Sequence, residues 1–325
     1  MAKRKTKIRD DYLVFVDTNK YLDAYRSDNE LSISLLEKLL PILPQIITSS
    51  QVEMEFEKNR QKVIREALDQ ISTNFDKPRI PAFLSDQKGT TKILNEFNDC
   101  KKRVNDLKKK VTNILKNPRT HDPVFKISQK IFRGVSPYNL GRDKNIRHEI
   151  RELAQKRFQL GYPPRKNDDT SMGDAVNWEW IINCASSAKR NIIIVSRDRD
   201  YGEHIDGRSY LNDWLAKEFE ERVPKGKKVV LFQRLSDALK ALEITVTEEE
   251  SEAENREILN AVSTIAGLGA ILSSDCAHSA SEILQNEFKK TKDLTCDFAK
   301  EMEEMLNSID YSKTIDNFMN HNYGK

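Results

Sequence analysis

Two short apolar runs interrupt a mostly polar chain, and both predict buried β-strands. Tyr12–Val16 (YLVFV) and Asn191–Val195 (NIIIV) place apolar residues at consecutive positions. This pattern is typical of strands in a parallel sheet that is covered on both faces. Ile46-Ile47 and Lys228–Phe232 are shorter runs of the same kind and predict two further strands.

Helical spacing of apolar positions separates these runs. The spacing predicts helices over 31–40, 51–73, 91–116, 145–160, 172–189, 211–222 and 235–242. Residues 76–90 and 134–141 are rich in Pro and Gly and are expected to be loops, and 196–202 is expected to be a turn. Strands that alternate with helices predict an α/β fold.

The same pattern suggests how the chain is organised. Residues 1–242 are expected to form one α/β domain, with a helical insertion at about 60–165. Residues 243–257 are acidic and are expected to be a linker. Residues 258–325 hold few aromatic residues and are expected to form a separate helical C-terminal module.

Charge is distributed unevenly along the 325 residues. Residues 1–240 carry 47 Lys and Arg against 34 Asp and Glu, whereas residues 241–325 carry 7 against 17. The densest basic run, Lys101–Arg119, holds eight basic residues and one acid. A basic body suits a polyanion such as nucleic acid, although a lysine-rich helix face is also common on solvent-exposed helices.

Composition excludes several classes of protein. The chain is 38% hydrophobic and 32% charged, which is typical of a globular protein, and no apolar run approaches the ~18 residues of a membrane span. The four cysteines are scattered without CxxC spacing, which indicates reduced thiols rather than a zinc site. Because no signal-peptide pattern precedes the first strand, we expect a cytoplasmic protein with no membrane partner.

Acidic residues follow the two clearest strands and flank them on helices. Asp17 comes directly after the first strand, and Asp198 and Asp200 follow the second. Asp174 opens the helix before the second strand, and Glu55 lies on the helix after Ile46-Ile47. Because active residues gather at the carboxyl ends of parallel strands, we expect these acids to meet. Converging carboxylates repel one another, and a Mg²⁺ or Mn²⁺ ion would relieve that repulsion and support phosphodiester hydrolysis.

Each acid also has a purely structural interpretation. Asp17 is in a position to cap a turn, and Asp174 is the fourth residue of a capping box that begins at Ser171. Glu55 is one of three acids on a polar helix, and Asp198 and Asp200 are of a type common in turns. The joint placement of the acids is more specific than any one of them.

Four segments together resemble the acidic motifs of PIN-domain nucleases, in particular bacterial PIN-like proteins with a long helical insertion. They are Val14-Phe-Val-Asp17-Thr18-Asn19, the helix Gln51–Arg60 with Glu55, the helix start Gly173-Asp174-Ala175, and Ile193-Ile-Val-Ser196-Arg-Asp198-Arg-Asp200. The resemblance covers about residues 11–235, the insertion being unmatched in detail.

The resemblance implies a three-layer α/β/α fold with a central parallel sheet, and a metal-dependent endoribonuclease that acts on single-stranded RNA. It implies Asp17, Glu55, Asp174 and Asp198 as catalytic metal ligands for Mg²⁺ or Mn²⁺, with Asp200 assisting or replacing Asp198. Glu53 lies close enough to Glu55 to be an alternative to it.

Substrate contacts are expected around these acids and on the basic segments. Thr18, Asn19 and Ser196 are polar neighbours that would orient ligands or water. The candidate phosphate contacts are Lys101, Lys102, Arg103, Lys108, Lys109, Lys110, Arg165 and Lys166. Tyr162 is a candidate for stacking on a base, with an incidental loop tyrosine as the alternative.

Other functions stay open at this level. The alternatives are a non-catalytic module of the same fold that binds RNA or protein, and a structure-specific DNA nuclease. Candidate partners are single-stranded RNA such as tRNA or mRNA, a regulatory protein, the chain's own acidic C-terminal segment acting as a restraint, and a further copy in an oligomer. A setting as a toxin or defence effector follows from the resemblance alone.

Overall fold

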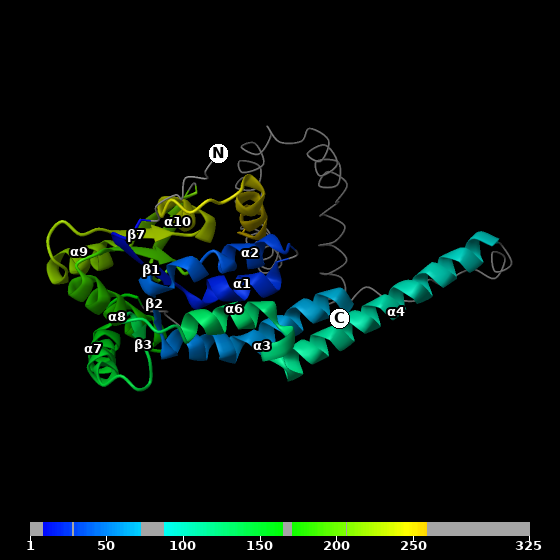
Figure 1. Cartoon of the computed structure of the whole chain (residues 1–325), viewed down its shortest axis with the longest axis horizontal. Coiled ribbons are helices and arrows are strands. Elements are labelled where there is room, and N and C mark those ends of the chain that lie inside the picture. The colour runs from blue at the N-terminus through cyan, green and yellow to red at the C-terminus, as the bar shows by residue number, and fades with distance from the viewer. Residues whose placement is uncertain (1–8, 28, 73–87, 165–170, 206, 259–325) are drawn as a thin grey trace, which may run out of the picture. The chain divides into compact units, whose positions relative to one another are not determined.

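The computed structural model describes residues 9–27, 29–72, 88–164, 171–205 and 207–258 (Figure 1). The chain divides into two compact units, residues 1–257 and residues 258–325. The first unit contains every element described below. Among the described residues, no helix is both long enough and apolar enough to cross a membrane.

A five-stranded sheet forms the centre of the first unit. Its strands run in the order β3-β2-β1-β4-β7, and each neighbouring pair is parallel. They are β1 (Tyr12–Val16), β2 (Ile46–Ser49), β3 (Asn139–Leu140), β4 (Asn191–Val195) and β7 (Val229–Phe232). All but the first residue of β1 and of β4 are buried, which confirms the prediction of strands covered on both faces.

Helices cover the sheet and complete a three-layer α/β/α fold (Figure 1). α8 packs against β2 and β4, α10 against β4 and β7, and α6 against β2. The helices are α1 (Thr18–Arg26), α2 (Leu31–Glu37), α3 (Ser50–Ser72), α4 (Lys88–Lys116), α5 (Pro118–His121), α6 (Pro123–Phe132), α7 (Ile146–Leu160), α8 (Gly173–Ala188), α9 (Asp213–Arg222) and α10 (Leu235–Ala241), with a 3-10 helix, η1 (Leu40–Gln45).

Two parts of the sheet and its surroundings differ from the sequence-based expectation. α2 ends at Glu37, and η1 follows it, because Pro41 and Pro44 lack the N–H groups that an α-helix needs. The expected turn at 196–202 is confirmed up to Tyr201, and an antiparallel hairpin that was not expected follows it, β5 (Gly202–Ile205) and β6 (Arg208–Leu211). Strands of four residues with alternating exposure carry little apolar signal.

The region 60–165 is only partly an insertion. β3 lies within it and forms one edge of the central sheet, although two residues are too few to show a strand pattern. α6 places Val124, Ile127 and Ile131 in the main hydrophobic core. α4 contacts α3 and α5 near one end and extends beyond the other helices in Figure 1.

Residues 243–257 are not the linker that their acidic composition suggested. The chain is helical over residues 248–258, and all of this helix up to residue 257 belongs to the first unit. Thr247 and Glu250 form a capping box: the Thr247 backbone N–H donates to the Glu250 carboxylate (2.8 Å), and the Glu250 N–H donates to Thr247 Oγ1 (3.2 Å). Glu250 and Glu254 are both buried, so this acidic helix is part of the folded body.

Candidate active site

Asp17 lies at the carboxyl end of β1, and its side chain is almost fully buried. Its Oδ1 accepts the backbone N–H of Thr18 (2.7 Å), which starts α1. Its Oδ2 accepts from the Ser196 hydroxyl (2.6 Å) and from the Asn19 amide (3.0 Å). Because Ser196 directly follows β4, this contact joins the ends of two neighbouring strands.

The Asp17 carboxyl group has no cationic partner among these contacts, and its pKa is raised to about 7. Burial is the main cause, because it disfavours the charged form. The negative charges of Asp198 and Glu55 raise the pKa further, while the hydrogen bonds from Ser196 and Thr18 lower it. A buried carboxyl group thus lies within the electrostatic influence of two further acids.

Glu55 reaches the same region from α3. Its Oε2 accepts from the Thr18 hydroxyl (3.1 Å), and its Oε1 accepts from the Gln51 amide (2.7 Å). A Cβ at Gly173 would overlap Glu55 Oε1 and lie 2.9 Å from Gln51 Nε2. Only glycine therefore lets the start of α8, with Asp174, approach the Glu55 carboxylate this closely.

Tyr201 is a buried residue whose pKa is affected by all four acids. Its ring is fully buried and lies 6.2 Å from the Phe15 ring, centroid to centroid, and its hydroxyl has no hydrogen-bond partner among the described residues. Its pKa is raised well above the ordinary value by burial and then by the charges of Asp174, Asp17, Glu55 and Asp198. Direct contacts join the segments that carry these acids: Thr18 bonds both Asp17 and Glu55, Ser196 joins Asp17 to the turn with Asp198, and Gly173, next to Asp174, lies against Glu55.

A sequence model of the PIN-domain family matches residues 14–201, which is more than half of the chain. The chain belongs to the PIN-domain family. The match spans all four acids and confirms the resemblance. No curated protein and no solved structure matches the chain significantly.

PIN domains are in general metal-dependent nucleases, and the chemistry of this PIN domain's acids fits a divalent cation. Carboxylate oxygens are the ligands that Mg²⁺ and Mn²⁺ prefer, and a cation would relieve the repulsion that raises the Asp17 pKa. Within the described ranges, however, no three His, Cys, Asp or Glu side chains stand close enough to hold one ion. The four acids lie on neighbouring segments of the site, but the described side chains do not form a ligand shell for one ion.

The structure gives different surroundings to the acids that the sequence left as alternatives. Glu53 points to Arg133 instead, and their side chains pair at 3.3 Å. Asp198 lies near enough to Asp17 to raise its pKa, and its backbone N–H donates to Ser196 Oγ (3.0 Å). Asp200 lies in the same turn and is partly exposed.

Of the expected substrate contacts, only three adjoin the acids. Thr18, Asn19 and Ser196 all contact the acid side chains directly. The six basic candidates of α4 are exposed, apart from the partly buried Lys108, and none is linked to the acids by a contact described above. Arg165 and Lys166 lie outside the described residues.

Sequence reasoning missed two residues of the site. Tyr201 follows the fourth motif directly but was read only as part of a turn, because a single tyrosine gives no sign of burial. Gln51 lies one helical turn before Glu55 and holds its carboxylate. Spacing of i and i+4 on a predicted helix was a usable signal for this pair.

Proposed function

We propose that this PIN domain is a metal-dependent endoribonuclease that hydrolyses phosphodiester bonds in single-stranded RNA. The observation that carries the proposal is the set of contacts that brings the acid-bearing segments together: Thr18 bonds both Asp17 and Glu55, and Ser196 joins Asp17 to the turn with Asp198. A buried carboxyl group with a raised pKa, next to other acids at the carboxyl ends of parallel strands, favours a functional site over a structural one.

In this proposal Asp17, Glu55, Asp174 and Asp198 would hold Mg²⁺ or Mn²⁺, with Asp200 within the same turn as an additional ligand. When bound, the cation would activate a water molecule and offset the charge that develops on the phosphate. Hydrogen bonds from Ser196 and from the Thr18 backbone fix the orientation of the Asp17 carboxylate. Its remaining lone pairs would therefore face the cation in a fixed direction.

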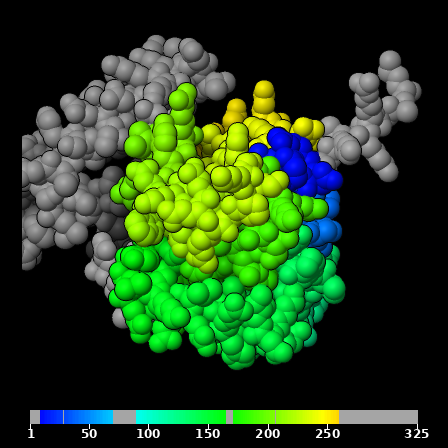
Figure 2. Space-filling view, turned by 90° about the vertical axis from the view of Figure 1, so that its left-hand side faces the viewer, coloured from blue at the N-terminus to red at the C-terminus, as the bar shows by residue number. Residues whose placement is uncertain are grey.

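An exposed aromatic pair supports a single-stranded substrate. The rings of Tyr162, just after α7, and Trp214, in the first turn of α9, lie 5.0 Å apart and are 39% and 44% exposed. α7 (green) and α9 (yellow-green) face the viewer in Figure 2. Lys217 lies 5.8 Å from the Trp214 ring, so this surface combines stacking faces with a positive charge. Unpaired bases stack on such surfaces without regard to sequence.

Basic residues on α4 supply a second candidate contact with the substrate. Lys101, Lys102, Arg103, Lys109 and Lys110 are exposed along this helix. They would contact phosphates and contribute affinity that falls with salt concentration.

Cleavage of a labelled single-stranded RNA oligonucleotide by the full chain, in Mg²⁺ or Mn²⁺, tests the proposal. Asp17→Asn and Asp174→Asn should lower the cleavage rate by more than about a hundredfold, since loss of outer partners of a metal alone costs about 10- to 100-fold. Glu53→Gln is the matched control, because this acid lies on α3 but pairs with Arg133. It should cleave as the wild type does.

Three results would contradict the proposal. Salt-dependent RNA binding with no cleavage in any metal would favour a binding module. Preferential cleavage of branched DNA would favour a structure-specific DNA nuclease. Undiminished cleavage by Asp17→Asn would show that the site is elsewhere.

A further inference from the structure

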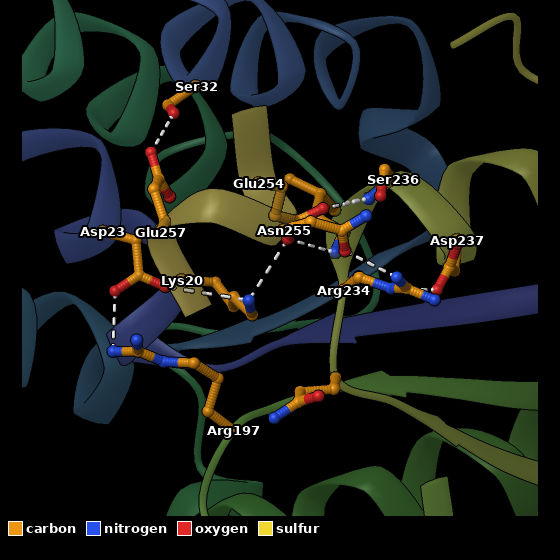
Figure 3. Close-up of polar contacts among 12 residues, drawn as sticks. Lys20, Asp23, Ser32, Arg197, Arg234, Ser236, Asp237, Glu254, Asn255 and Glu257 are labelled. Atoms are coloured by element: carbon orange, nitrogen blue, oxygen red, sulfur yellow. Dashed lines mark hydrogen bonds and ion pairs between the residues drawn. The ribbon is translucent and has the colours of Figure 1, made fainter. Parts of the chain in front are cut away.

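Lys20 is a buried cation on α1, three residues after Asp17. Its side chain is only 3% exposed, and its ammonium group lies 3.2 Å from Glu254 and 3.7 Å from Asp23 (Figure 3). A buried lysine that keeps its charge needs such partners, because removing one of them leaves an uncompensated charge in a medium of low polarity. Lys20 therefore depends on Glu254, which lies 234 positions further along the chain.

Asp23 extends this contact to the turn after β4. Its carboxylate also pairs with Arg197 (2.7 Å). Arg197 stands between Ser196, whose hydroxyl donates to Asp17, and Asp198, whose backbone N–H donates to Ser196 Oγ. The sequence of pairs Glu254–Lys20–Asp23–Arg197, here called the ion-pair chain, thus ends inside the turn that carries two site residues.

Glu254 is held firmly at the other end of the ion-pair chain. Its two carboxylate oxygens accept the backbone N–H groups of Leu235 (2.7 Å) and Ser236 (2.8 Å), where α10 begins. The next residue, Asn255, accepts from Arg234 (2.5 Å), and Glu257 bonds with Ser32 on α2. Figure 3 shows these contacts around one buried group of charges. The helix over residues 248–258 is therefore fixed to α2 and α10 as well as to α1.

We propose that Glu254 and Lys20 are positioning residues for the active site, acting through Asp23 on Arg197 and so on the turn that holds Ser196 and Asp198. This inference rests on the proposed function, since it assigns the acidic helix a part in the geometry of that site. It also replaces the expectation that the acidic segment as a whole restrains the body: residues up to 257 complete the site.

Glu250 provides a matched control on the same helix. It is buried like Glu254, 3% exposed against 5%, and likewise pairs with a lysine, Lys38, at 2.5 Å. The second hydrogen bond of the Lys38 ammonium group is to the backbone carbonyl of Thr245. Glu250→Gln therefore removes a comparable ion pair that does not run through Asp23 and Arg197.

The experiment compares Glu254→Gln with Glu250→Gln in the full chain, each at the same interval below its own melting midpoint. We measure kcat and KM on single-stranded RNA, and the rise in melting temperature on adding Mn²⁺. Glu254→Gln should lower kcat by about 10- to 100-fold with little change in KM, and should reduce the Mn²⁺-induced rise. Glu250→Gln should leave kcat and the Mn²⁺ response close to wild type.

A second variant separates positioning from stability. The double variant Lys20→Met, Glu254→Gln removes both charges of the pair, so it should regain stability relative to Glu254→Gln alone while kcat stays low. Recovery of kcat together with stability, or equal effects of Glu254→Gln and Glu250→Gln, would overturn the positioning role. A wild-type protein that neither cleaves RNA nor responds to Mn²⁺ would instead refute the proposed function, and the positioning role with it.

Discussion

Two buried acids in this PIN domain, Asp17 and Glu179, have pKa values shifted in opposite directions. At the ends of β1 and β4, Asp17 has only neutral hydrogen-bond donors and two other acids acting on it, and its pKa rises to about 7. On α8, Glu179 is just as buried but pairs with Arg157 (2.9 Å) and Arg222 (2.6 Å). Burial alone would raise the Glu179 pKa, but the two arginines outweigh it and lower the pKa.

This difference shows how a buried acid in a functional site can be distinguished from a buried acid that stabilises the fold. The charge of Glu179 is compensated within the protein and joins α8 to α7 and α9. Asp17 itself receives hydrogen bonds only from neutral groups, Thr18, Asn19 and Ser196, and the nearby charges of Asp198 and Glu55 raise its pKa. Uncompensated buried charge is costly to stability, and it is typical of sites that bind an ion.

Replacement of Glu179 should have the largest effect on stability. Glu179→Gln leaves the Arg157 guanidinium buried with one partner fewer, so we expect the free energy of unfolding to fall by about 3–5 kcal/mol. Urea denaturation of the metal-free protein measures this. Glu55→Gln is the comparison, and because no cation within the described ranges pairs with Glu55, this variant should lose far less stability. Equal losses in the two variants would erase the distinction between the two groups.

Gly173→Ala should have an intermediate effect. The added Cβ overlaps Glu55 Oε1, so the Glu55 carboxylate must move, and because this is the end of a flexible side chain the unfolding free energy should fall by no more than about 1 kcal/mol. The rate of RNA cleavage should fall by about a hundredfold, because catalysis depends on the exact position of the Glu55 carboxylate. Gly89→Ala on α4 is the control, since nothing lies within 4 Å of its added Cβ. If Gly173→Ala cleaves RNA normally, the approach of α8 to Glu55 is unimportant.

The smallest expected effect is a dependence of stability on pH. An aspartate side chain has an ordinary pKa of 3.8, which we take for the unfolded chain, whereas the pKa of Asp17 in the folded protein is about 7. Between these two pH values the native state therefore binds more protons than the unfolded state. Stability of the metal-free protein should therefore fall as pH rises from about 4 to about 7, relative to Asp17→Asn. The contribution of Glu179 has the opposite sign and is lost as pH falls, because its pKa is lowered.

Unfolding of wild type and Asp17→Asn in EDTA, across this pH range, measures the contribution of Asp17 alone. The variant should gain on the wild type as pH rises. A difference that stays constant with pH would show that Asp17 is not perturbed.

The sequence predicted the parts of this fold that carry dense, local signals. β1 and β4 were recognisable because apolar residues occupy consecutive positions, and Asp17 and Asp198 follow from where those strands end. β3 was not recognisable, because two residues have no period. The helix over 248–258 was missed because its acids suggested solvent, whereas Glu254 is buried against Lys20, a partner that only the three-dimensional structure brings near.

The choice between Glu53 and Glu55 shows the same limit. Both residues are acids on one predicted helix, two positions apart, and the helix pattern alone does not say which one faces β1. The packing of α3 against α1 decides it: Glu55 bonds with Thr18, and Glu53 pairs with Arg133. Side-chain contacts between distant segments supply the information that spacing lacks.

The most direct test of the central claim is the melting temperature of wild type and Asp17→Asn, measured with and without Mn²⁺. If the acids around Tyr201 hold a divalent cation, Mn²⁺ should raise the melting temperature of the wild type, because an ion that binds only the folded state stabilises it. The same addition should leave Asp17→Asn nearly unchanged. A wild-type protein that does not respond, or a variant that responds as strongly, would contradict the account.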